Sequence, residues 1–174
     1  MSNAVDLRGE SQDIRRGPSV LFICTGNICR SPTAEGVFRH LARERGVLGR
    51  LRVDSAGTPD YHVGEPPDAR SVEHAARRGY DLAPLRARQV TGADFHEFDR
   101  ILAMDRGHLR QLKAMAPAGS PARVAMFLDH SEGWRGLDVP DPYYGGSRGF
   151  EEVLDMVEEA SARLLEEILA ELSR

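Results

Sequence analysis

The chain has 174 residues, of which 41% are hydrophobic and 29% charged. These values lie near globular averages and exclude a disordered chain, a collagen-like repeat or a coiled coil as a description of the whole protein. Twenty-three Lys and Arg residues against 27 Asp and Glu residues give a formal charge of −4, so the overall field favours neither a nucleic acid nor a membrane partner.

The start of the chain differs in composition from the rest. Residues 1–17 are polar, mixed in charge and without sustained periodicity, so we predict a flexible arm followed by a single domain over residues 18–174. The longest strictly apolar runs cover five residues, whereas a membrane-spanning helix needs about 20. Two cysteines cannot form a disulfide framework, and no apolar signal region precedes Val20. A cytoplasmic location is therefore expected.

Apolar strand-like runs and helical patterns alternate from residue 19 to the end of the chain. Ser31-Pro32 is expected to cap the first helix and Asp68 the second. Residues 54–58 are expected to form a polar loop. The predicted strands are 19–24, 51–53, 100–104 and 123–128. The first predicted helix begins at about 32 and ends before Gly46, and the second begins at about 69 and ends before Gly79. The third runs from about 106 to 116 and the fourth from about 150 to 172. This order, with right-handed crossovers, predicts an α/β fold with a four-stranded parallel sheet.

The first predicted strand ends at Cys24 and is followed by a short loop, TGNIC, and then by Arg30 and Ser31 at a helix start. Such a loop directs backbone N–H groups at one point, which binds a tetrahedral anion and stabilises a thiolate. Gly26 is expected to adopt the unusual dihedral angles that a tight loop needs. Cysteines beside a helix N-terminus or an arginine are often thiolates at neutral pH. Cys24 is therefore predicted to be a nucleophile, with Arg30 holding two phosphoryl oxygens and Ser31 donating to the sulfur.

A lone cysteine at the end of an apolar strand is more often a core residue than a catalyst. The surrounding octet favours catalysis, because it lies between a strand and a helix start, contains Gly and Asn, and is followed by Ser-Pro. Attack on phosphorus also needs an acid to protonate the leaving oxygen. Asp141, held between Pro140 and Pro142, fits this role, although an Asp-Pro pair is commonly only a turn.

The segment VLFICTGNICRSPTAEGVF strongly resembles the opening of the low-molecular-weight protein tyrosine phosphatases. The motifs DSAGT at 54–58, RARQVT at 86–91, ILAMD at 101–105 and DVPDPYYGG at 138–146 follow in the order of that family. The resemblance covers roughly residues 18–172. It implies a three-layer α/β/α fold with a four-stranded parallel sheet, of the phosphotyrosine protein phosphatase I-like (flavodoxin-like) type.

The resemblance implies a protein-tyrosine-phosphatase that hydrolyses phosphotyrosine in proteins, and small aryl phosphates, through a cysteinyl-phosphate intermediate without a metal or other cofactor. Matched by position, Cys24 is the nucleophile, Arg30 the phosphate clamp and Asp141 the general acid and base. The residues implied to bind or support phosphate are Thr25, Gly26, Asn27, Ile28, Cys29, Ser31 and Ser55. The expected partners are phosphotyrosine proteins and inorganic phosphate, which is both product and competitive ligand. The enzyme is expected to be a monomer or a weak dimer.

This chain departs from the family at one position. Family members often carry a histidine that helps to hold the loop asparagine, where this chain has Leu85. Asn27 is therefore expected to be held by Ser55 or by water instead. Activity is expected to survive, because neither the nucleophile nor the clamp is changed.

Tyrosines follow the predicted acid and occur in a second loop expected at the cleft. Tyr143, Tyr144 and Tyr61 could wall a slot deep enough for a phosphotyrosine ring and too deep for phosphoserine to reach the thiolate. Surface tyrosines without a role are the alternative. His62 is a candidate for tuning the charge of the rim, although an ordinary surface histidine is the simpler interpretation.

Cys29 lies five residues after Cys24 in the same loop. It is either an inert buried thiol or a redox partner that captures a peroxide-generated sulfenic acid on Cys24 as a reversible disulfide. The remaining histidines show no metal-ligand spacing with the cysteines, so no metal site is expected.

Three other functions compete with tyrosine phosphatase activity. Arginine phosphatases resemble this scaffold but typically have threonine where this loop has Ile28, and a branched apolar side chain suits an aromatic ring better than a guanidinium. Thioredoxin-coupled arsenate reductases share the fold and the loop but relay electrons through additional cysteines, which this chain lacks. An inactive phosphate-binding module requires loss of the nucleophile, the clamp or the acid, and none is lost. Phosphotyrosine hydrolysis is the preferred hypothesis.

Overall fold

The computed structural model describes residues 17–59, 61–144 and 146–173. The predicted N-terminal arm thus lies outside the described residues, apart from Gly17. The strands are β1 (Ser19–Cys24), β2 (Arg52–Gly57), β3 (Arg100–Ala103) and β4 (Arg123–Met126). The α-helices are α2 (Arg30–Glu44), α3 (Ala69–Arg77), α4 (Asp94–Glu97), α5 (Arg106–Met115) and α6 (Ser147–Leu172). Three short 3₁₀ helices are η1 (Leu48–Arg50), η2 (Phe127–His130) and η3 (Pro142–Tyr144).

The four strands form one parallel sheet in the order β2-β1-β3-β4, which confirms the predicted sheet. β1 lies in the interior and pairs with β2 on one side and β3 on the other, so the strand order reverses beside it. Ligands of such sheets bind at the carboxyl ends of the strands next to the reversal. Cys24 stands at that end of β1, opposite Gly57 of β2.

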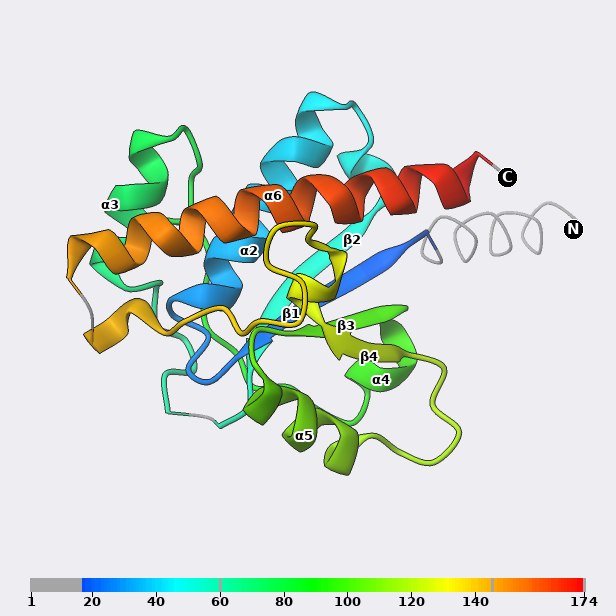
Figure 1. Ribbon diagram of the computed structural model, residues 1–174. Coiled ribbons are helices and arrows are strands. Elements are labelled where there is room, and N and C mark those ends of the chain that lie inside the picture. Colours follow the sequence, from blue (N-terminus) through cyan, green and yellow to red (C-terminus); the bar gives the residue numbers. More distant parts are fainter. Residues whose placement is uncertain (1–16, 60, 145, 174) are drawn as a thin grey trace, which may run out of the picture.

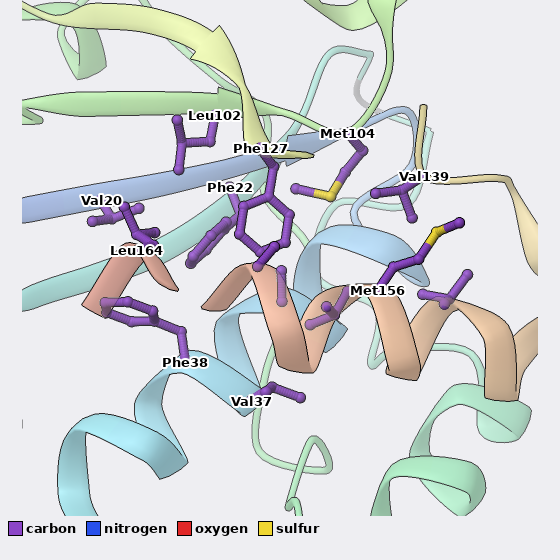
Figure 2. Packing of buried hydrophobic residues seen from close by; sticks show 14 of the residues in the cluster. Val20, Phe22, Val37, Phe38, Leu102, Met104, Phe127, Val139, Met156 and Leu164 are labelled. Atoms are coloured by element: carbon purple, nitrogen blue, oxygen red, sulfur yellow. The ribbon is translucent and has the colours of Figure 1, made fainter. Parts of the chain in front are cut away.

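Helices cover both faces of the sheet, as the apolar run in β1 predicts (Figure 1). α2, α3 and α6 lie over one face, and α4 and α5 over the other. Side chains of β1 alternate between the two cores: Phe22 belongs to the cluster under α2 and α6, while Ile23 belongs to the cluster under α5. Figure 2 shows Phe22 between Phe38 of α2 and Phe127, with ring-centroid distances of 5.8 and 5.2 Å. Three layers of structure result, with the sheet in the middle.

Two element boundaries near the sheet's carboxyl end differ from the prediction. Residues 54–57 belong to β2 and are not a polar loop, because they continue the pairing with β1 as far as Cys24 opposite Gly57. The predicted cap at Ser31 is wrong: α2 begins at Arg30, the N-cap position is Cys29, and no side chain caps it. The Asp68 cap is confirmed, since its carboxylate accepts from the backbone N–H of Arg70 at 2.8 Å.

The remaining differences lie at element ends. β4 stops at Met126 because the chain turns into η2, and the single-turn helix α4 was not predicted. α6 starts three residues earlier than expected, at Ser147, and its 26 residues lie across α2 (Figure 1). Within the described ranges, no helix is both long and apolar enough to cross a bilayer.

Candidate active site

The loop between β1 and α2, residues 25–29, curls beneath the N-terminus of α2. Asn27 has a φ of 56°, a left-handed conformation that asparagine tolerates better than most residues. The expectation for Gly26 is wrong, because Asn27 and not Gly26 carries the positive φ. A Cβ at position 26 would lie 2.8 Å from Cδ2 of His62, so a side chain there would require the His62 ring to shift.

Gly57 supports this loop from the end of β2. A Cβ at position 57 would lie 2.8 Å from the carbonyl oxygen of Thr25 and 3.2 Å from the carbonyl carbon of Gly26. These are backbone atoms, so the loop could not settle against β2 if residue 57 carried a side chain. Glycine in the DSAGT segment therefore serves the shape of the loop, a function that the sequence analysis missed.

A chain of hydrogen bonds behind the loop ends on the sulfur of Cys24. The Nδ2 of Asn27 donates to the Oγ of Ser31 at 2.8 Å and to the Oγ of Ser55 at 2.9 Å. The backbone N–H of Arg88 donates to Oδ1 of Asn27 at 3.0 Å, which fixes the orientation of the amide. Because Ser31 accepts from Asn27, its own hydrogen is free to point at Sγ of Cys24, 2.9 Å away. The arrangement places a hydroxyl donor on the sulfur.

The other end of this chain is the buried carboxylate of Glu35. Ser55 donates to Oε1 of Glu35 at 2.7 Å, and Nε of Arg39 donates to Oε2 at 2.7 Å. Burial raises the pKa of Glu35, and the hydrogen bonds from Ser55 and Arg39 act against that rise. Leu85 packs against the main core. The expected hydrogen bond between Asn27 and Ser55 is present. The sequence analysis missed Glu35, although its spacing of four residues from Arg39 was a signal for an ion pair on one helix face.

The guanidinium of Arg30 is buried and fixed on one side. Its Nη1 donates to Oδ2 of Asp105 and to the carbonyl oxygen of Val139, both at 2.9 Å. Its Nη2 lies 3.7 Å from Oδ2 of Asp141. Burial acts to raise the pKa of Asp105, but hydrogen bonds from the backbone N–H of His108 and from Arg30 outweigh it and hold the pKa below its usual value. An ionised Asp105 thus anchors the arginine.

His108 of α5 holds the first residue of the loop. Its Nε2 lies 2.7 Å from the hydroxyl of Thr25. Burial lowers the pKa of His108 to about 4, and the carboxylate of Asp105 only partly opposes this shift. The imidazole is therefore neutral at neutral pH and connects α5 to the loop by a hydrogen bond without adding charge.

A cleft of about 270 Å³ opens above the loop. It is lined by Cys24, Thr25, Gly26, Ile28, Cys29, Arg30, Tyr61, His62, Asp141 and Tyr143. Three other predicted residues do not line the cleft and are fully or almost fully buried, namely Asn27, Ser31 and Ser55. The side chain of Tyr144 falls outside the described part of the structure.

The carboxylate of Asp141 faces this cleft from the segment before η3. Its Oδ1 accepts from the backbone N–H of Tyr143 at 2.9 Å, so a local turn helps to direct it. Arg70 in turn donates to the carbonyl oxygen of Tyr143 at 3.1 Å. The side chain of Asp141 is 42% exposed, so solvent can reach it.

Cys24 and Cys29 are both free and buried. Burial, and next the carboxylate of Asp68, raise the pKa of Cys29 to about 12. Cys29 is thus a neutral thiol at neutral pH and is poorly suited to attack phosphorus. Among the described residues, no three His, Cys, Asp or Glu side chains come together as candidate metal ligands.

Comparison with known proteins matches residues 19–174 to the low molecular weight phosphotyrosine protein phosphatases. The chain belongs to this family. A low molecular weight protein-tyrosine-phosphatase of Streptomyces coelicolor is 47% identical over 149 residues, which cover 84% of this chain and 90% of the relative.

Solved structures of related phosphatases share the fold. A protein tyrosine phosphatase from Entamoeba histolytica, with Hepes in its active site, gives a TM-score of 0.84 at 36% identity over 90% of this chain and 99% of that one. The Drosophila arginine phosphatase gives a TM-score of 0.78 at 31% identity, over 85% of this chain and 96% of that one.

The phosphatase gathers most of the predicted side chains in one place. The predicted nucleophile, clamp and acid, the rim residues Tyr61, His62 and Tyr143, and loop residue Ile28 all line the cleft. Tyr61 is 76% exposed, so only part of its ring can face a ligand. The sequence analysis missed the residues that support the site from other elements, namely Glu35, Gly57, Asp105 and His108.

Proposed function

We propose that this phosphatase hydrolyses phosphotyrosine in proteins through a cysteinyl-phosphate intermediate. The observation that carries this proposal is the cleft itself, in which the thiol of Cys24, the guanidinium of Arg30 and the carboxyl of Asp141 meet. The loop and the N-terminus of α2 beneath it favour an anion at that point. Membership of the family supports phosphoproteins as the substrate class.

In the first step, the thiolate of Cys24 attacks phosphorus in line with the tyrosyl oxygen. An S–P bond forms as the P–O bond to the ring breaks, and Asp141 gives its proton to the departing phenolate oxygen. Arg30 and the N–H groups of the loop bind the equatorial oxygens and stabilise their charge in the transition state. The hydroxyl of Ser31 stabilises the sulfur when it later leaves.

In the second step, water attacks phosphorus from the side that the phenol has left. Asp141, now a carboxylate, takes a proton from this water as the O–P bond forms. The S–P bond breaks, and its electron pair returns to Cys24 as a thiolate. Inorganic phosphate is released and competes with substrate for the same loop.

Replacing Asp141 by alanine is expected to lower kcat by about 10²- to 10⁴-fold, because protonation of the leaving oxygen is lost. The loss should be greater for phenyl phosphate than for para-nitrophenyl phosphate, since nitrophenolate leaves without help. Steady-state kinetics with both substrates measures the difference. Asp138→Ala is the matched control, because Asp138 is an exposed carboxylate three residues away that pairs with Arg106. An equal loss with both substrates would contradict the role of general acid.

The side chains around the cleft favour phosphotyrosine over phosphoarginine. Ile28 and the ring of Tyr143 line the cleft and offer apolar surface to an aromatic ring. We expect kcat/KM for a phosphotyrosine peptide to exceed that for the matching phosphoarginine peptide by at least about tenfold. Ile28→Thr should narrow this ratio. Faster hydrolysis of phosphoarginine by the parent enzyme would make arginine phosphatase the better assignment.

We further propose that Cys29 protects the nucleophile from irreversible oxidation. Peroxide would oxidise the thiolate of Cys24 to a sulfenic acid, and the thiol of Cys29 would then displace water to form a disulfide. Attack requires the thiolate form of Cys29, and its pKa of about 12 makes that form scarce at neutral pH. Capture should therefore become faster as pH rises.

A further inference from the structure

A second hollow adjoins the cleft and takes no part in the proposed chemistry. It has a volume of about 490 Å³ and lies between α5 and the segment that follows β2. Gln111, Ala114 and Met115 form its α5 wall, and Thr58, Pro59 and Tyr61 form the opposite wall. We call it the α5 groove.

The α5 groove and the catalytic cleft share two lining residues. These are Thr25 and Tyr61, so the two hollows are neighbours on the surface. The hydroxyl of Thr25 is held by His108 at 2.7 Å, which fixes this shared wall relative to α5. The groove is therefore within reach of residues that flank a phosphotyrosine bound in the cleft.

The lining of the α5 groove suits an apolar side chain. No charged side chain lines it among the described residues. Met115 is 40% exposed and Tyr61 is 76% exposed, so both present apolar surface to solvent. Methionine adapts its shape to different apolar partners, and a tyrosine ring stacks on them. Gln111 and Thr58 offer polar groups that can bind the backbone of a peptide.

We propose that the α5 groove binds an apolar side chain of the substrate polypeptide within two residues of the phosphotyrosine. The inference rests on the proposed function, since it needs phosphotyrosine in the cleft. An extended chain advances at most about 3.6 Å per residue, so two residues span about 7 Å, which suits a groove that shares a wall with the cleft. The groove thus selects among phosphotyrosine proteins by their sequence.

The test compares phosphotyrosine peptides that carry leucine, glycine or aspartate at each position from two before to two after the phosphotyrosine. We expect leucine to raise kcat/KM over glycine by about tenfold at one or more of these positions. In Ala114→Glu, which places a charged chain in the groove, this preference should fall below about twofold. Met115→Glu is a second variant with the same expectation. Lys113→Glu is the matched control, because Lys113 is exposed on α5 and does not line the groove.

Para-nitrophenyl phosphate separates this inference from the proposed function. It occupies only the cleft, so its hydrolysis should be the same in the parent and in both groove variants. Failure of the parent enzyme to hydrolyse it would count against the proposed function. Hydrolysis of para-nitrophenyl phosphate with no preference for leucine, with a preference for aspartate, or with a leucine preference that survives Ala114→Glu and Met115→Glu would overturn the groove assignment.

Discussion

Replacing Cys24 by serine is expected to lower kcat for phosphotyrosine peptides by at least about 10⁴-fold. Serine keeps the size of the side chain and the contact with Ser31, so the loop and the phosphate site should persist. A serine hydroxyl, however, holds its proton at neutral pH and is a far weaker nucleophile than a thiolate. The nucleophile is lost while the site that binds the substrate remains.

Two measurements make this prediction specific. Rapid quenching of the parent enzyme during turnover, followed by mass spectrometry, should find phosphate on the peptide that contains Cys24. Calorimetry with inorganic phosphate should show that Cys24→Ser still binds the anion, which distinguishes loss of chemistry from loss of folding. Turnover by Cys24→Ser above about 1% of the parent, or phosphate on a residue other than Cys24, would contradict covalent catalysis by this thiol.

The sheet could be predicted from the sequence because it depends on local patterns. The run at residues 20–24 is apolar at every position, and β1 is in fact buried on both faces. The continuation of β2 through Asp54 and Ser55 was missed because the local pattern there is polar. Polar residues at a strand end resemble a loop until the partner strand is known, and here the partner is the end of β1.

The meeting of Cys24, Arg30 and their loop at one cleft could also be predicted, because eight consecutive residues contain them. The residues that anchor the guanidinium of Arg30 could not be predicted. Asp105 lies 75 residues from Arg30 in the sequence, and Val139 lies 109 residues away. They meet Arg30 because β3 pairs beside β1 and the chain after β4 returns across the same edge. Such contacts follow from the order of the strands and leave no local pattern.

Ser31 was expected in two roles, as the cap of the first helix and as a donor to the sulfur of Cys24, and the structure contradicts only the first. A serine followed by proline at a helix start normally indicates a cap. In this protein the hydroxyl of Ser31 contacts the sulfur of Cys24 and accepts a hydrogen bond from Asn27. It therefore supports the site and does not cap the helix. The N-terminal N–H groups of α2 are left without a side-chain cap. They remain available for an anion in the cleft.

Replacing Arg30 by alanine is expected to lower kcat/KM by about 10³- to 10⁵-fold, the range known for arginines that stabilise a transferring phosphoryl group. The side chain is 5% exposed and is anchored through Nη1, so its remaining N–H groups meet the phosphate already oriented. Alanine removes both the positive charge and the planar pair of N–H donors. Arg30→Lys keeps a charge but not the planar pair of donors, and it should recover only a small part of the activity.

The variant Asp105→Asn tests how much the orientation of Arg30 contributes while Arg30 itself is kept. It keeps Arg30 but weakens the ion pair at 2.9 Å that orients the guanidinium, so the expected loss in kcat/KM is smaller, about tenfold. Thermal unfolding of each variant checks the fold, since Arg30→Ala leaves Asp105 without its cation and exposes the carbonyl of Val139 to an empty space. Folded Arg30→Lys with the kcat/KM of the parent, and with unchanged inhibition by inorganic phosphate, would show that charge alone suffices and that bidentate binding by Arg30 is not needed.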